Sequence, residues 1–124
     1  MSKAVRISSA EWEVMAVAWE RAPVPASTVA DVLERKKHWS LATVRTLLRR
    51  LVNKGALAQQ SDGRRHLYKP LVSLEDCVRR ESEWFLDRVV GRAPFATILH
   101  LVRNAPLSTE DIQELRRILR EKEK

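Results

Sequence analysis

One stretch, a capped helix followed directly by a tight hairpin, restricts the fold more than any other part of the chain. Ser40 is a favoured N-cap residue and Gly55 stands where a helix ends on a left-handed residue, so together they predict a helix over 41–54. Asp62-Gly63 then lies between two short runs in which apolar and polar residues alternate. An Asp-Gly pair in that setting predicts a β-hairpin. Few small folds place a helix and a hairpin in this order.

Two more helices are predicted ahead of this stretch. Ser8-Ser9-Ala10-Glu11 is a capping box, and apolar residues follow it at helical spacing until the prolines at 23 and 25 end the helix. A second helix is predicted from near Ala26 to about Lys37. Three helices and then a hairpin is the order of a winged helix-turn-helix. We therefore predict a mainly α (α+β) chain with a winged-helix DNA-binding domain over 5–71.

The pattern changes after Pro70. Three amphipathic helices are predicted, from Ser73 to about Val90, from Phe95 to Val102, and after Ser108. Residues 72–124 are therefore expected to form a separate helical region.

Basic charge is concentrated in one third of the chain. The formal net charge is +7, and residues 35–69 contain ten lysines and arginines but a single acid, Asp62. A localised cationic field is typical of proteins that bind a polyanion, so nucleic acid is the expected ligand.

The helix over 41–54 has two different sides. Leu41, Val44, Leu47, Leu48 and Leu51 share one side and are expected in the core, while hydroxylated and basic residues occupy the other. The major groove of DNA admits one α-helix whose outward side lacks acids and bulky apolar groups. Threonines near the helix start are expected to reach base edges, and arginines to reach phosphates or guanine. The predicted DNA-binding residues, including the arginines of the hairpin, are Ser40, Ala42, Thr43, Arg45, Thr46, Arg49, Arg50, Arg64 and Arg65.

Other classes of function find little support. No glycine-rich phosphate loop is present, and Cys77 is the only cysteine, so we expect no enzyme activity, no cofactor and no metal site. The lone Cys77 lies on an apolar helix side and is expected to be an inert thiol in a cytoplasmic protein, without membrane insertion. A winged-helix module that binds RNA or a protein partner remains the alternative, because basic charge alone does not distinguish these ligands.

The sequence also resembles the penicillinase repressor family, which includes the methicillin-resistance, β-lactamase and copper-responsive repressors. The resemblance rests on Ile7 to Met15, on Trp39-Ser40, and on Thr43 to Leu51 followed by Lys54-Gly55, and it extends over nearly the whole chain. It implies a transcriptional repressor that binds an inverted-repeat operator in double-stranded DNA as a homodimer. In that family the C-terminal helices join the two copies.

The resemblance also assigns roles in the C-terminal region. The expected dimerisation residues are Leu74, Val78, Phe85, Val89, Phe95, Ile98, Leu99, Leu101, Val102, Ile112, Leu115, Ile118 and Leu119. In many members a membrane sensor metalloprotease triggers cleavage in this region, between Asn and Phe, and His100-Leu101 stands at the matching position here. The chain departs from the family in two further respects: Ala42 replaces a lysine, and the C-terminus lacks the cysteines of the copper-responsive members.

Overall fold

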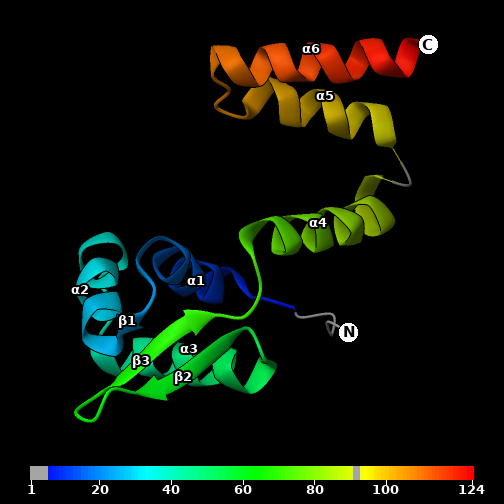
Figure 1. Cartoon of the computed structure of the whole chain (residues 1–124). Helices are drawn as coiled ribbons and strands as arrows, with labels where there is room; N and C mark the ends of the chain where they lie inside the picture. Colours follow the sequence, from blue (N-terminus) through cyan, green and yellow to red (C-terminus); the bar gives the residue numbers. More distant parts are fainter. Residues whose placement is uncertain (1–5, 91–92) are drawn as a thin grey trace. The chain divides into compact units, whose positions relative to one another are not determined.

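The computed structural model describes residues 6–90 and 93–124, whose elements appear in Figure 1. In chain order they are α1 (Ser9–Arg21), β1 (Val24–Pro25), α2 (Ala26–Lys37), α3 (Leu41–Lys54), β2 (Leu57–Ser61), β3 (His66–Pro70), α4 (Leu74–Phe85), the π-helix η1 (Leu86–Val90), α5 (Pro94–Asn104) and α6 (Thr109–Glu123). The three helices and the hairpin predicted for the first half are confirmed.

The chain divides into two compact units, the first ending at Ser82 and the second beginning at Glu83. The predicted domain limits of 5–71 and 72–124 describe a functional division and stay a prediction. Residue 5 itself lies outside the described residues.

The start of α1 shows why the sequence forms a helix there. Ser8 accepts a hydrogen bond from the Glu11 amide at 3.2 Å, and the Glu11 carboxylate accepts one from the Ser8 amide at 2.8 Å. This capping box satisfies two amides that a helix start otherwise leaves without partners. Lys54 Nζ, at the end of α3, lies 2.5 Å from Glu11 Oε1 and 2.8 Å from the Arg6 carbonyl oxygen. The same carboxylate therefore joins the start of α1 to the end of α3.

The sheet contains a strand that the sequence did not predict. Its order is β1-β3-β2 and both pairings are antiparallel, with Val24 opposite Tyr68. The prolines at 23 and 25 were expected only to end a helix. They also favour an extended backbone, and an edge strand tolerates a proline that lacks an amide hydrogen. The buried Val24 side chain holds this short strand in place.

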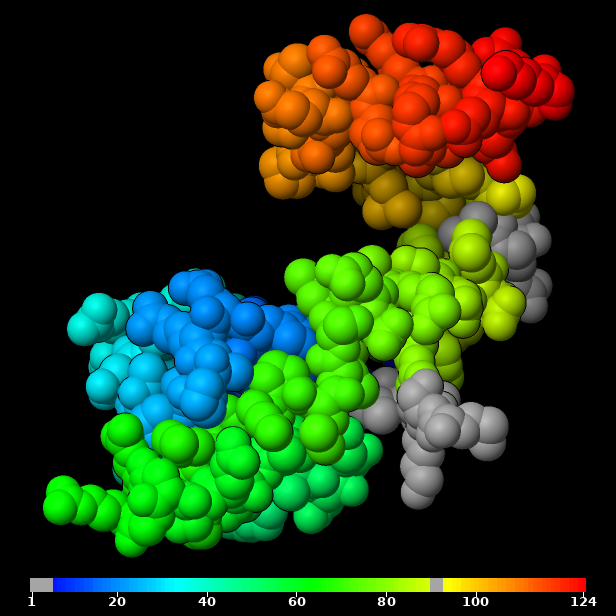
Figure 2. Space-filling view, viewed as in Figure 1, coloured from blue at the N-terminus to red at the C-terminus, as the bar shows by residue number. Residues whose placement is uncertain are grey.

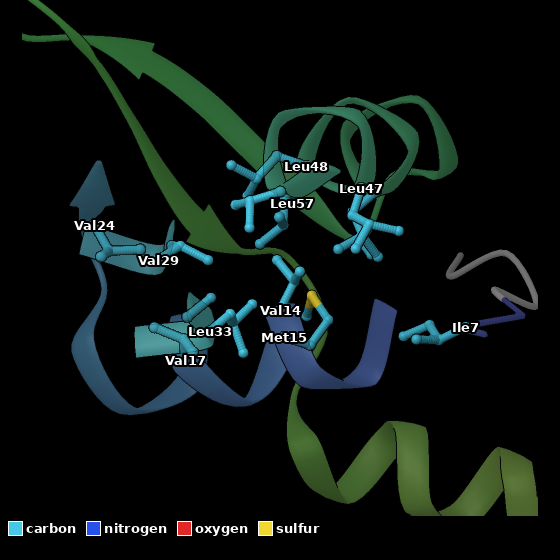
Figure 3. Close-up of a cluster of buried hydrophobic side chains, with 14 of the residues drawn as sticks. Ile7, Val14, Met15, Val17, Val24, Val29, Leu33, Leu47, Leu48 and Leu57 are labelled. Atoms are coloured by element: carbon cyan, nitrogen blue, oxygen red, sulfur yellow. The ribbon is translucent and has the colours of Figure 1, made fainter. Parts of the chain in front are cut away.

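The core of the first unit lies between the three helices and the sheet. Figure 3 shows Val14 and Met15 of α1, Leu33 of α2, and Leu47 and Leu48 of α3 converging with Leu57 of β2. Each of these side chains is buried. The predicted apolar side of α3 is thus in the core, with one exception. Leu41 is 40 % exposed, because it occupies the first position of the helix, beyond the reach of the neighbouring elements.

The helices of the C-terminal half differ from the predictions mainly at their ends. The helix predicted through Val90 is α-helical only to Phe85 and continues as a π-helix, and the predicted 95–102 helix runs from Pro94 to Asn104. Ser108 begins α6 with a second capping box, completed by Asp111. Neither α5 nor α6 contains a buried residue in the single chain. Among the described residues, no helix combines the length and apolarity needed to cross a membrane.

Candidate nucleic-acid interface

The outward side of α3 is the first component of the candidate interface. Ser40 caps the helix by accepting a hydrogen bond from the Thr43 amide at 3.2 Å, and Gly55 ends it with a φ of 84°, a left-handed conformation that glycine adopts without strain. Burial of the leucine side turns the opposite side to solvent. The exposed residues there include Ala42, Thr43, Arg45, Arg49 and Arg50.

The threonine hydroxyls on α3 are already engaged. Thr46 Oγ1 donates to the Ala42 carbonyl oxygen at 3.0 Å, and its side chain is half-buried. Ser40 Oγ donates to Thr43 Oγ1 at 3.1 Å, which leaves the Thr43 hydroxyl hydrogen available for another acceptor. A base edge would therefore meet the methyl group of Thr46 and the O–H group of Thr43. The sequence alone did not distinguish these two roles.

Most arginines of this surface have no acidic partner among the described side chains. Among the side chains that the structure describes, Arg45, Arg49, Arg50 and Arg64 make no ion pair or hydrogen bond. Guanidinium groups without partners keep all their donors for a ligand, and their planar fork matches the geometry of phosphate oxygens. Mutual repulsion among cations is tolerated here because the groups are exposed to water.

The hairpin tip is the second component, and Asp62 shapes it. Asp62 Oδ1 accepts hydrogen bonds from the Arg64 and Arg65 amides, each at 3.1 Å, and Gly63 adopts a φ of 97°. The two amide hydrogen bonds hold the pKa of the Asp62 carboxyl below its usual value. Arg65 Nε also lies 3.5 Å from Asp62 Oδ2. Figure 2 shows this tip, in green, standing clear of the body of its unit.

A hollow of about 500 Å³ lies where these two components meet. Its lining includes four of the predicted DNA-binding residues, Arg45 and Arg49 from α3 and Arg64 and Arg65 from the hairpin tip. The other predicted residues do not belong to this lining; they are the N-cap Ser40 and, within α3, Ala42, Thr43, Thr46 and Arg50. None of the described residues that line the hollow is an acid. The result is a concave cationic surface of a kind that accommodates a phosphodiester backbone.

Sequence reasoning missed several residues of this hollow. The rest of the lining is Pro25, Ala26, Ser27, Gln59, His66 and Tyr68. The start of α2 lies here, and no side chain caps it, so its first amides can donate to an anion. Tyr68 is in the lining because β3 is the central strand of the sheet. The sequence predicted the start of α2 near Ala26, but its position beside the hairpin depends on the β1–β3 pairing.

The predicted dimerisation residues are mostly exposed in the single chain. Leu99 and Leu115 are half-buried, and the others are at least 38 % exposed, with Phe95 highest at 71 %. Within the second unit, α5, α6 and the segment between them also line a hollow of about 260 Å³, and its lining residues are apolar except for Arg116. Exposed apolar area on this scale is characteristic of a surface covered by a partner.

His100 and Leu101, at the position matched to the family's cleaved bond, lie in the middle of α5. Both side chains are exposed, and Asn104 Nδ2 donates to the His100 carbonyl oxygen at 2.8 Å. The peptide bond is therefore part of a regular helix rather than a loop.

The groups considered for other chemistry are dispersed. Within 6–90 and 93–124 no three histidine, cysteine or acidic side chains gather as metal ligands. Cys77 is 6 % exposed, and burial raises the pKa of its thiol. A raised pKa disfavours the reactive thiolate, so Cys77 behaves as a core residue.

Comparison with known proteins places these features in a family. A family model described as penicillinase repressor matches residues 7–121. The chain is 35 % identical to the methicillin resistance regulatory protein MecI of Staphylococcus aureus (strain N315), over 98 % of each chain, and 36 % identical to the penicillinase repressor of Bacillus licheniformis, over 98 % of this chain and 94 % of the relative. A solved structure of B. licheniformis BlaI, monomeric and in complex with the blaP half-operator, is similar with a TM-score of 0.54 and 38 % identity, over 61 % of this chain and 93 % of that one.

Proposed function

This chain belongs to the penicillinase repressor family and is a DNA-binding transcriptional repressor, and we propose that it holds its operator with α3 and the hairpin tip. One observation supports this assignment above the others. The outward side of α3 and the hairpin tip together form a concave cationic surface whose arginines, apart from Arg65, lack acidic partners among the described residues.

The proposed mechanism follows from the dimensions of DNA. α3 enters the major groove, where Thr43 and Thr46 near its start contact base edges. Arg45, Arg49 and Arg50 bind phosphates or guanine. The wing, which is the hairpin β2–β3 with Arg64 and Arg65 at its tip, binds the flanking backbone. Phosphate contacts supply affinity and register, while base contacts supply sequence preference.

Repression through an inverted repeat requires two copies. We propose a homodimer joined by the exposed apolar side chains of the C-terminal half, with each copy bound to one half-site. Linking two half-site contacts raises affinity by about 10² to 10⁴ over one contact. The protein then acts by occupying DNA in the cytoplasm, not by catalysis.

Release of the operator is the regulated step of this proposal. Cutting the His100–Leu101 bond divides α5 and removes the linkage between the copies. The first unit of each copy, which carries α3 and the wing and is the DNA-binding unit, then binds DNA with half-site affinity only. Because the bond is helical, a protease triggered by a membrane sensor must open α5 locally before cleavage. The RNA or protein-binding alternative is not favoured, since the relatives are repressors and one is solved on its half-operator.

Selection of bound sequences from random duplexes tests the proposal. The selected sites are expected to be inverted repeats, with half-sites that place two α3 helices in successive major grooves. On the selected duplex, Arg64→Ala is expected to weaken operator and unrelated DNA alike and to reduce the salt slope by about 0.9. Lys122→Ala at the end of α6 removes the same charge and is the matched control. Selected sequences without two-fold symmetry, or no selected sequence, would contradict the assignment.

A further inference from the structure

A side-chain hydrogen bond joins the chain that leaves the wing to α1. Trp19 Nε1 donates a hydrogen bond of 2.9 Å to the carbonyl oxygen of Val72, which lies just after β3. Val72 itself contacts the core of the first unit. An indole N–H is a donor only, so this contact is its single available hydrogen bond.

Neighbouring contacts hold the same segment. The Leu71 amide donates to the Ala56 carbonyl oxygen at 2.8 Å, and Ser73 Oγ accepts from the Asp76 amide at 3.0 Å at the start of α4. Cys77, in the next turn, is in the core, and Glu81 lies 3.7 Å from the Arg6 guanidinium. The first turns of α4 are therefore fixed on the DNA-binding unit.

The Trp19 indole is itself held in one orientation. Its ring meets that of Trp12 edge to face, with centroids 5.4 Å apart and planes inclined by 63°. Both rings are half-buried against the core. An aromatic pair in this geometry favours one ring position, so the indole N–H already points at the chain after β3.

We propose that Trp19 is a positioning residue which, through Val72, sets the direction of α4 relative to α3 and thereby the spacing of operator half-sites. α1 carries Trp19 and packs on α3, so it connects the recognition surface to the chain after β3. In a two-fold dimer, the direction in which each chain leaves its DNA-binding unit decides how far apart the two α3 helices lie. This inference rests on the proposed function, because it presumes operator binding by two linked copies.

Trp19→Phe tests the proposal by keeping a ring and removing the donor. The full chain is titrated with a single half-site duplex and with duplexes whose two half-sites are moved apart or together one base pair at a time. Trp12→Phe is the matched control, since it alters the same ring pair, and the Trp12 indole has no hydrogen bond within the described residues. If Trp19→Phe does not fold, Trp19→Met replaces it, because a methionine fills irregular space without a donor.

We expect Trp19→Phe to change the preference for half-site spacing without changing the affinity for a single half-site. Wild type and Trp12→Phe should prefer one spacing by about tenfold over a shift of two base pairs, and Trp19→Phe should reduce that preference to about twofold. Half-site affinity should be unchanged in all three. An unaltered spacing profile in Trp19→Phe, or an equal loss on half-site and two-site duplexes, overturns the positioning role. Failure of the wild type to bind any of these duplexes, with one half-site or two, instead overturns the proposed function itself.

Discussion

Thr46 illustrates how one side chain divides its groups between the fold and a ligand. Its hydroxyl is bonded to the Ala42 carbonyl oxygen, so its methyl group is what remains for a base. We expect Thr46→Ala to weaken operator binding by about 1–3 kcal/mol with little effect on unrelated DNA. Thr46→Val, which keeps a methyl group, should bind close to wild type in the same titrations.

The control for Thr46 is present in the same chain. Thr97 Oγ1 donates to the Ala93 carbonyl oxygen at 2.8 Å, the same one-turn geometry on α5. Thr97→Ala therefore reproduces the local change in a helix without the DNA surface. Operator binding by Thr46→Val as weak as that of Thr46→Ala would show that the hydroxyl, not the methyl, contacts the operator.

Glu11 shows how a buried charge is retained. It is 2 % exposed, and burial by itself would raise the pKa of its carboxyl. Hydrogen bonds from Lys54 and Ser8, with the Lys54 charge, outweigh burial and leave the pKa below its ordinary value. A carboxyl with a lowered folded-state pKa stabilises the fold fully above its unfolded pKa of about 4.3, and that stability is lost as pH falls through the folded pKa.

Two substitutions test this ion pair. Lys54→Met leaves a buried carboxylate without its cation and should lower the free energy of unfolding at pH 7 by about 2 kcal/mol, more than Glu11→Gln does. Glu11→Gln should also flatten the loss of stability below about pH 4.3. Chemical denaturation across pH measures both effects. Lys37→Met, which breaks the exposed 3.9 Å pair with Glu13, is the control and should cost less than about 0.5 kcal/mol. If Lys54→Met lowered the free energy of unfolding no more than Lys37→Met does, the Lys54–Glu11 pair would not contribute to the stability of the fold.

At the scale of elements, Asp62 has two opposing effects on the wing: it shapes the turn, and it reduces the positive charge that binds DNA. Asp62 forms the turn by accepting two amides, yet it is the only acid in 35–69 and it engages Arg65. An asparagine in its place would keep both the oxygen that accepts the amides and the preference of an Asn-Gly pair for this turn. We therefore expect Asp62→Asn to tighten binding to operator and unrelated DNA several-fold, with a salt slope steeper by up to about 0.9.

Anisotropy titrations at several salt concentrations measure this change. Glu114→Gln is the control, because Glu114 also pairs with an arginine three residues along, Arg117, but on α6. Weaker binding by Asp62→Asn would mean that the aspartate charge, and not only its oxygen, is needed to shape the wing.

At the scale of the whole molecule, the boundary between the units can be tested by truncation. A chain ending at Ser82 retains Val72, Cys77 and the Arg6–Glu81 contact, so it should fold and bind a half-site while losing about 10² to 10⁴ in affinity for the inverted repeat. A chain ending at Leu71 lacks these contacts and should unfold at a lower temperature. Thermal unfolding and duplex titration of both fragments measure the difference. If the two fragments unfolded at the same temperature, the structural boundary would lie at Leu71. If the fragment ending at Ser82 bound the inverted repeat as tightly as the full chain does, dimerisation would not contribute to operator binding.

The amino-acid sequence by itself determined most of the helices, the hairpin and the polyanionic character of the expected ligand. Capping residues at Ser8, Ser40 and Ser108, the leucine side of α3 and the Asp-Gly turn are local signals, and local hydrogen bonds and periodicity set local structure. The concentration of basic residues in 35–69 is likewise visible without a fold.

Only the tertiary structure decided which residues meet. The β1–β3 pairing brings Ser27 and Tyr68 beside the arginines of α3, the core leaves Leu41 exposed, and Trp19 reaches Val72 across 53 positions of sequence. Contacts of this kind depend on how elements distant in sequence pack together. Periodicity and composition predict the elements, but they do not predict which residues of different elements come into contact.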